Sequence, residues 1–233
     1  SPRDGSRSVP VESATHRRSG SAGSATFRAA YAAHLDALTG AQKPSAGIAA
    51  YSRYVNRPLG RRVAAAAAPL GLTPNQVTVL SATLSFTAIA LLALAEPTRL
   101  TGPLIALLLA GGYVLDSVDG QLARLVGSGS LSGEWLDHTV DTVKSATLHA
   151  AVLISWFRFP PIDDTRILLV PLAYQVVGVV GFFGLMSMPA LRAKARDRAL
   201  LTTAHPPARP EHPLRTWLLL PNDYGVLCWV FVL

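Results

Sequence analysis

Long apolar runs, separated by short polar or basic stretches, dominate the chain after residue 48. A helix needs about 20 residues to cross a bilayer, and four runs are candidates for such helices, at residues 77–95, 100–115, 136–157 and 167–188. A fifth apolar stretch begins near Trp217 or Tyr224. The pattern predicts an all-α fold, a multi-pass transmembrane helix bundle in which we expect six spans when the protein is complete.

The stretch before the first run is more polar. Residues 1–24 are rich in Ser, Arg and Gly and predict disorder, whereas residues 25–40 have the periodicity of a short helix. In residues 49–68 arginines are interleaved with apolar side chains, which predicts an amphipathic juxtamembrane helix that lies along the membrane surface and is kinked or split at Pro58. A solvated basic face is the alternative interpretation of the same arginines.

These patterns divide the chain into two parts. Residues 1–48 are an N-terminal segment that we expect to be disordered or to contain a short helix. Residues 49–233 are a membrane domain, which we expect to be cut short at its C-terminus. Composition agrees with a membrane domain, because half of the 233 residues are hydrophobic, only 15% are charged, and the mean hydropathy is +0.33.

The net charge of +7 has a membrane explanation. The arginines flank the apolar runs, so an anionic membrane surface accounts for them more simply than nucleic acid, and we expect no nucleic-acid partner. Eleven Lys and Arg residues lie in the loops on one side of the predicted bundle and three on the other. The positive-inside rule then places the N-terminus, and the acidic stretch described next, on the cytoplasmic side.

Four aspartates are grouped in the stretch DSVDGQLARLVGSGSLSGEWLDHTVD, which runs from Asp116 to Asp141. Spacings of three and four residues put each pair on one helix face, so the four carboxylates would converge where one apolar helix ends and the next begins. Burying like charges together is costly, and a hard divalent cation is the usual compensation. A solvated loop is the alternative, but such a loop would not need the interleaved Gly and Ala residues.

The order and spacing of these residues resemble the signature of the CDP-alcohol phosphotransferases, also called CDP-alcohol phosphatidyltransferases. Every fixed position of that signature is matched, by Asp116, Asp119, Gly120, Ala123, Arg124, Gly133, Asp137 and Asp141. The resemblance covers roughly residues 50–233. It implies an integral membrane transferase of phospholipid biosynthesis, usually a homodimer, that moves a substituted phosphate from a CDP-alcohol to an acceptor alcohol and releases CMP.

The resemblance also implies a two-metal site for Mg²⁺ or Mn²⁺. Asp116, Asp119 and Asp137 would be the principal metal ligands, and Asp141 would contribute to the metal site and act as the general base. Lys144 lies three residues further along the same helix face. It could pair with Asp141 and make it a weaker base, whereas burial would make it a stronger one, and the sequence leaves both open.

Smaller residues of the signature would bind the donor. By resemblance, Gly120, Ala123 and Gly133 let the nucleotide approach the helix backbone closely. Arg124 would bind a phosphate or an aspartate, with a cytoplasmic membrane anchor as the alternative. Asn75 and Thr78 resemble a Pro-Asn-x-x-Thr segment that lines the nucleotide pocket, although Asn75 could equally cap a helix.

The residues of the signature do not identify the acceptor alcohol. Residues 53–78 look closest to the branch of the family that uses inositol phosphate, so we expect a polyol or inositol phosphate, with a lipid-pathway alcohol as the alternative. A divalent-cation transporter would need acids in several spans, but here they cluster at one end of the bundle. A binding-only relative without activity gains no support, because all four acids are present. We interpret His138 and His149 as structural.

Overall fold

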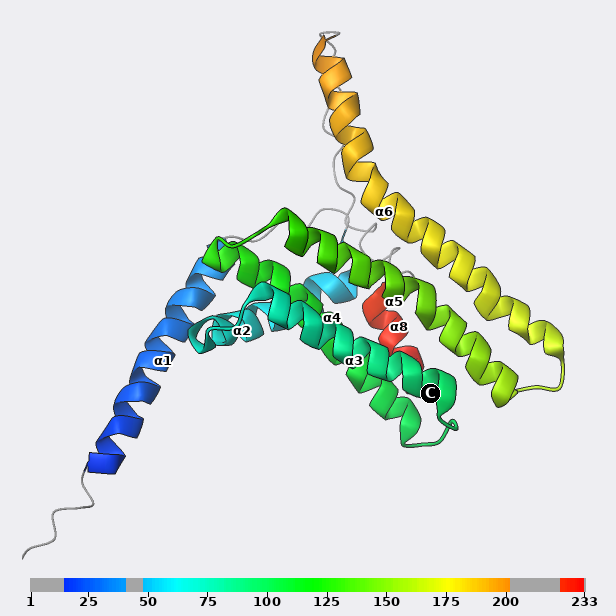
Figure 1. The fold of residues 1–233 in the computed structure, drawn as a ribbon, viewed down its shortest axis with the longest axis horizontal. Coiled ribbons are helices and arrows are strands. Elements are labelled where there is room, and N and C mark those ends of the chain that lie inside the picture. Colours follow the sequence, from blue (N-terminus) through cyan, green and yellow to red (C-terminus); the bar gives the residue numbers. More distant parts are fainter. Residues whose placement is uncertain (1–14, 41–47, 202–222, 233) are drawn as a thin grey trace, which may run out of the picture.

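The computed structural model describes residues 15–40, 48–201 and 223–232, and within these ranges the secondary structure is helical and contains no strand. Helices α3 (Pro74–Leu94), α4 (Thr101–Val126) and α5 (Leu131–Arg158) pack on one another as a bundle. Helix α6 (Leu169–Leu201) follows a short 3₁₀ turn, η3 (Thr165–Leu168), packs on α5 and extends well beyond the other helices (Figure 1). The predicted all-α bundle is confirmed.

Three described segments are long and apolar enough to cross a membrane, by length and composition: Pro74–Leu94, Thr101–Val126 and Thr165–Arg198. Helix α5 is also long enough, with 28 residues, but it is not among them. Its first half carries Glu134, Asp137, Asp141 and Lys144, so only its second half is apolar. The predicted third span, residues 136–157, therefore corresponds to a helix with one charged end.

Local sequence fixes the ends of these helices. Thr73 caps α3 in a capping box, in which its hydroxyl accepts from Gln76 N and Gln76 Oε1 accepts from Thr73 N. Helix α4 stops at Gly127, which has a left-handed φ of 63°. Helix α5 starts after Ser130, whose hydroxyl accepts from Gly133 N at 3.0 Å. The link between α4 and α5 is thus very short, and it turns the chain back on itself.

The two ends of the bundle differ in what surrounds them. The α4–α5 link lies at the end where α1 and α2 pack, and the α3–α4 turn lies at the other end (Figure 1). One core cluster joins α3, α4, α5 and α8 around Leu109 and Leu148. A second cluster joins α1, α2, α3 and α4 around Leu38, Val118 and Leu122.

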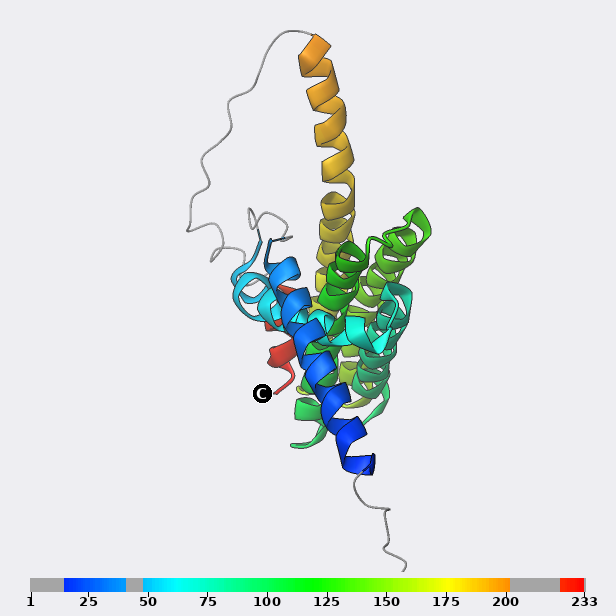
Figure 2. The same cartoon turned by 90° about the vertical axis from the view of Figure 1, so that its left-hand side faces the viewer.

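The N-terminal helix is longer than predicted. Helix α1 (Thr15–Gly40) includes residues 15–24, which the sequence assigned to a disordered stretch, and it ends at Gly40 as predicted. Its C-terminal part is held by tertiary packing, because Leu38 is buried against α2 and α4. Figure 2 shows α1 running across one side of the bundle. Residues 1–14 lie outside the described part of the chain.

Residues 49–68 form helical segments with a change of geometry before Pro58. A five-residue π-helix, η1 (Ser52–Asn56), precedes α2 (Arg57–Ala67), in which Pro58 occupies the first turn, where its missing N–H is tolerated. Helix α2 is followed by a 3₁₀ turn, η2 (Ala68–Leu70). The small residues of α2 are buried against α1 and α4, so other helices of the chain cover its apolar face.

The last described helix is α8 (Tyr224–Val230), which packs on α4. It begins at one of the two positions that the sequence favoured for the fifth span. The other position, Trp217, and the proline-rich linker expected at residues 205–213 lie outside the described residues.

We predict that Gly112 is essential for the α3–α4 contact. A Cβ at this position would overlap Ser85 Oγ and lie 3.2 Å from the Ser81 carbonyl oxygen, whereas a Cβ at Gly111 would meet only Leu84 Cδ1, at 3.5 Å. Gly112→Val should therefore lower the free energy of unfolding by about 1–3 kcal/mol, measured by thermal and denaturant unfolding in detergent. Gly111→Val is the matched control. If both variants are equally stable, α3 and α4 do not pack as described.

Candidate active site

Three of the four aspartates meet between α4 and α5, about two to three helical turns from the link that joins the two helices and not at the helix ends that the sequence predicted. One carboxylate oxygen each of Asp116, Asp137 and Asp141 lies within 4.8 Å of the others. The short α4–α5 link brings the two helices together, and the spacing of four residues puts Asp137 and Asp141 on one face of α5. The convergence expected from the sequence is present for these three residues.

Asp119 lies beside this group but not within it. It is buried, its Oδ2 accepts a hydrogen bond of 2.6 Å from the Thr78 hydroxyl, and its Oδ1 accepts from Gly120 N. Asp116 and Asp137 are near enough to interact with it electrostatically. The structure thus places Thr78 as a hydrogen-bond partner of Asp119, which links α3 to α4 at the site.

Lys144 provides a positive charge among the acids. Its side chain is buried, and its Nζ lies 2.7 Å from Asp116 Oδ1, 3.2 Å from Asp141 Oδ1 and 3.3 Å from Ser81 Oγ. The structure shows the pairing that the sequence left open, because Lys144 contacts Asp141 and also Asp116. One ammonium thus contacts two carboxylates and offsets only part of the charge that they carry when ionised.

The remaining signature residues surround this cluster. Gly133 lies against Asn75, because a Cβ on Gly133 would be 3.1 Å from Asn75 Oδ1. The N-termini of α3 and α5 are therefore adjacent here. Asn75 is not the cap of α3, since Thr73 has that role. Arg124 interacts electrostatically with Asp119. A Cβ on Gly120 would be in ordinary van der Waals contact with Arg124 Nη1, at 3.7 Å. Ala123 is partly buried on the same helix.

Neither histidine belongs to the group of acids. His138 lies 3.7 Å from Glu134 on the exposed side of α5. His149 is further along α5, where its ring lies 5.9 Å from the ring of Tyr174, and it is one of the nearest neighbours of Gly178 on α6.

The residues present fit a divalent cation. The donor set is made of carboxylate oxygens, the ligands that Mg²⁺ and Mn²⁺ prefer. The three oxygens are close enough to share an ion, and the single ammonium of Lys144 is shared between two of the carboxylates. Asp116, Asp137 and Asp141 would hold it, with Asp119 adjacent.

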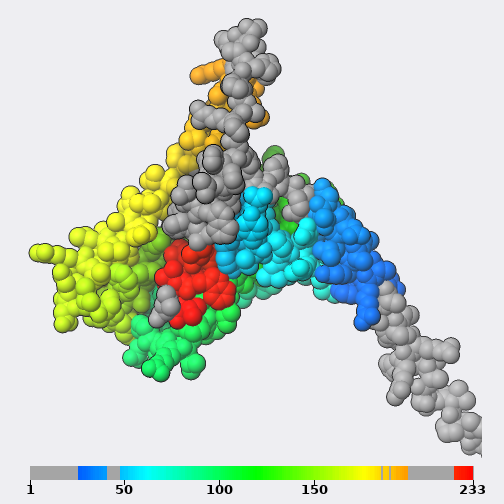
Figure 3. Space-filling view, turned by 180° about the vertical axis from the view of Figure 1, so that it is seen from behind, coloured from blue at the N-terminus to red at the C-terminus, as the bar shows by residue number. Residues whose placement is uncertain are grey.

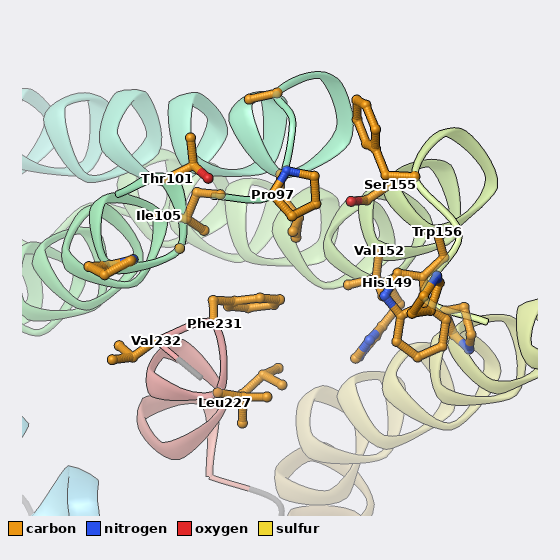
Figure 4. A pocket seen from close by; sticks show the side chains of 18 of the residues that line it. Pro97, Thr101, Ile105, His149, Val152, Ser155, Trp156, Leu227, Phe231 and Val232 are labelled. Atoms are coloured by element: carbon orange, nitrogen blue, oxygen red, sulfur yellow. The ribbon is translucent and has the colours of Figure 1, made fainter. Parts of the chain in front are cut away.

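A cavity of about 1040 Å³ lies elsewhere in the bundle. Residues of the α3–α4 turn, the second half of α5 and α8 line it, among them Thr101, Ile105, Val152 and Phe231 (Figure 4). Along α4, Ile105 is about 16 Å from Asp116 at 1.5 Å per residue. The cavity is therefore at the opposite end of the bundle and is not part of the acidic site.

Two site residues were not expected from the sequence. Ser81 accepts from Lys144 and donates to the Gly112 carbonyl, at 2.8 Å. Its position three residues after Thr78, on the same helix face, was a usable signal. Tyr224 of α8 interacts electrostatically with Asp116 and Asp141. No local signal indicated this, because α8 is remote in the sequence.

The arrangement defines a helical membrane protein with a partly buried carboxylate cluster between two helices of its bundle. The CDP-alcohol phosphatidyltransferase family model matches residues 71–220, more than half of the chain. The chain therefore belongs to the CDP-alcohol phosphatidyltransferase family, and its apolar helices are those of an integral membrane protein.

The curated relatives include the archaetidylinositol phosphate synthase of Pyrococcus horikoshii. It is 38% identical to this chain over 94 residues, which are 40% of this chain and 47% of the relative. The match thus spans about half the length of that protein.

We predict that Lys144→Met destabilises the protein when metal is removed. The substitution leaves Asp116 and Asp141 without their shared cation, and breaking a buried ion pair costs about 3 kcal/mol or more. The melting temperature in EDTA should fall, and Mg²⁺ should restore part of the loss because it replaces the missing charge. Lys194→Met, on an exposed part of α6, is the control. An unchanged melting temperature for Lys144→Met would contradict the ion pair.

Thr78→Val should weaken metal binding without removing a ligand. The Thr78 hydroxyl orients Asp119, which the family resemblance makes a metal ligand, and loss of a hydrogen bond to a ligand typically reduces metal affinity about 10- to 100-fold. Titration with Mn²⁺, followed by electron paramagnetic resonance, measures the change. Thr83→Val is the matched control, since Thr83 bonds only its own helix, at Val79 O. Equal affinities for the two variants would show that Thr78 does not support the site.

Proposed function

We propose that this protein catalyses the metal-dependent transfer of a substituted phosphate group from a CDP-alcohol to an acceptor alcohol, with release of CMP. The single observation that carries the proposal is the convergence of Asp116, Asp137 and Asp141 at one end of the bundle. Membership of the family supports the same reaction. In balanced form, a bond forms between the acceptor oxygen and the transferred phosphorus, the bond from that phosphorus to the CMP oxygen breaks, and the hydroxyl proton goes to a base.

The aspartates would hold Mg²⁺ or Mn²⁺, two ions in our proposal. The chemistry that these ions supply when bound is neutralisation of the diphosphate and polarisation of its reacting oxygens. Asp116, Asp137 and Asp141 offer the closest set of ligands, and Asp119 completes the acidic site.

Asp141 is our candidate for the general base. Lys144 bonds one of its oxygens and so fixes the orientation of the carboxylate. A base that is held in place within hydrogen-bond reach of the acceptor hydroxyl accelerates transfer about 10²- to 10⁴-fold. Asp141 lies on α5 one turn further from the α4–α5 link than Asp137. In our proposal Asp137 is a metal ligand and does not act as the base.

The donor nucleotide would bind at the adjacent helix ends. Arg124 would contact a phosphate, and Gly120, Ala123 and Gly133 would allow close approach of the nucleotide. Asn75 would line the same pocket, because it lies against Gly133 at the N-terminus of α3. Thr78 would contribute to this pocket indirectly, through its hydrogen bond to Asp119.

For the acceptor we propose an inositol or polyol phosphate. The name of the Pyrococcus horikoshii relative, an archaetidylinositol phosphate synthase, supports this choice. We further propose that the site faces the cytoplasm, as the distribution of Lys and Arg indicates, and that the protein is a homodimer. A divalent-cation transporter has less support, because α3 contains no acidic residue and the acids of α4 and α5 lie at one end.

The test is CMP release by the purified protein in detergent, with a panel of CDP-alcohols and phosphorylated acceptors. We expect acceptor-dependent CMP that is abolished by EDTA and reduced about 10²- to 10⁴-fold in Asp141→Asn. Asp163→Asn, at an exposed loop position, is the matched control and should be as active as the wild type. If Asp141→Asn retains full activity, Asp141 is not the base. If EDTA has no effect, the reaction does not depend on a metal.

A further inference from the structure

The hydroxyl of Tyr224 is a buried polar group that the described residues leave without a hydrogen-bond partner. Its ring packs against that of Tyr113, which lies about one helical turn before Asp116 on α4, and the hydroxyl bonds to neither Asp116 nor Asp141. Buried polar atoms nearly always have a partner, since leaving one unpaired costs stability. An unpaired hydroxyl beside a reactive site therefore points to a ligand.

The position of Tyr224 is fixed by the way α8 is attached. Asp223 is buried and accepts two backbone hydrogen bonds, from Ser52 N at 3.1 Å and from Gly225 N at 2.9 Å. At the other end of α8, Trp229 Nε1 donates to the Tyr51 hydroxyl at 3.0 Å. Figure 3 shows α8, in red, against the cyan segment that contains η1.

The orientation of the ring is restricted as well. Tyr224 packs edge-on against Tyr113, with ring centroids 5.2 Å apart and an interplanar angle of 65°. A Cβ on Gly225 would overlap the ring of Tyr51, the residue that precedes η1, so α8 and the start of η1 are in close contact. The neighbouring tyrosines differ from Tyr224 because their hydroxyls have partners, Trp229 for Tyr51 and Ser52 for Tyr113.

We propose that the Tyr224 hydroxyl donates a hydrogen bond to a phosphate oxygen of a substrate bound at the carboxylate cluster. This proposal rests on the function proposed above. A phenol is protonated at neutral pH and is a donor, and a phosphate oxygen is a strong acceptor. Tyr224 would thereby bring α8 into the site as a substrate-binding residue. The phosphate could belong to the CDP-alcohol or to a phosphorylated acceptor.

The experiment compares Tyr224→Phe with the wild type in detergent and Mg²⁺. The variant keeps the ring and removes only the hydroxyl. Its ligand-free melting temperature should equal or exceed that of the wild type, because no internal bond is lost. Either the Kd for CDP-diacylglycerol or the KM for myo-inositol 1-phosphate should rise about 10- to 100-fold, which corresponds to the loss of a hydrogen bond to a charged group. Tyr174→Phe, an exposed position on α6, is the control for a lost phenol.

The two ligands distinguish the two sources of phosphate, because the variant should lose affinity only for the ligand whose phosphate contacts Tyr224. If neither weakens while the wild type binds both, the inference is wrong and the proposed function stands. A melting temperature well below that of the wild type also overturns it, since the hydroxyl would then have an internal partner, such as a bridging water. If the wild type binds no CDP-alcohol, the proposed function fails and the inference fails with it.

Discussion

The ion pairs of Lys144 are the interaction on which the rest of the site depends. Acids placed together in an apolar bundle repel one another, and burial penalises their charged forms further. Lys144 of α5 offsets part of this cost by contacting Asp116 of α4 and Asp141 of its own helix, and Ser81 of α3 accepts a further bond from it. One side chain therefore connects three helices at the point where the chemistry would occur.

This arrangement is possible because the helices can approach closely. Gly112 lets α4 pack directly against Ser81 and Ser85 of α3, and the Ser81 hydroxyl, which Lys144 contacts, donates to the Gly112 carbonyl. The short α4–α5 link fixes the other side, since it leaves the chain little choice but to return along α4. Packing and electrostatics thus reinforce one another: the close helix contact brings the acids together, and the shared ammonium makes that contact tolerable.

Helix α8 and the π-helix η1 complete the surroundings of the site. They are far apart in the chain, but Asp223 joins them through backbone hydrogen bonds and the tyrosine rings pack between them. A π-helix before Pro58 accommodates the proline without breaking the helical path. As a result, the rings of Tyr51, Tyr113 and Tyr224 pack in a row beside the part of α4 that carries Asp116.

The sequence alone determined the apolar helices and the acidic signature, because apolar periodicity, helix caps and the spacing of Asp116 to Asp141 are local properties. It did not determine the full length of α1, whose first residues are polar. It also indicated that the acids converge, since helix geometry dictates which residues share a face. Only the tertiary structure decided that Asp119 bonds Thr78 instead of joining the close group, that Lys144 pairs with two acids, and that Tyr224 lies beside them. These contacts join residues of different helices, and their geometry depends on how whole helices pack, which no local pattern encodes.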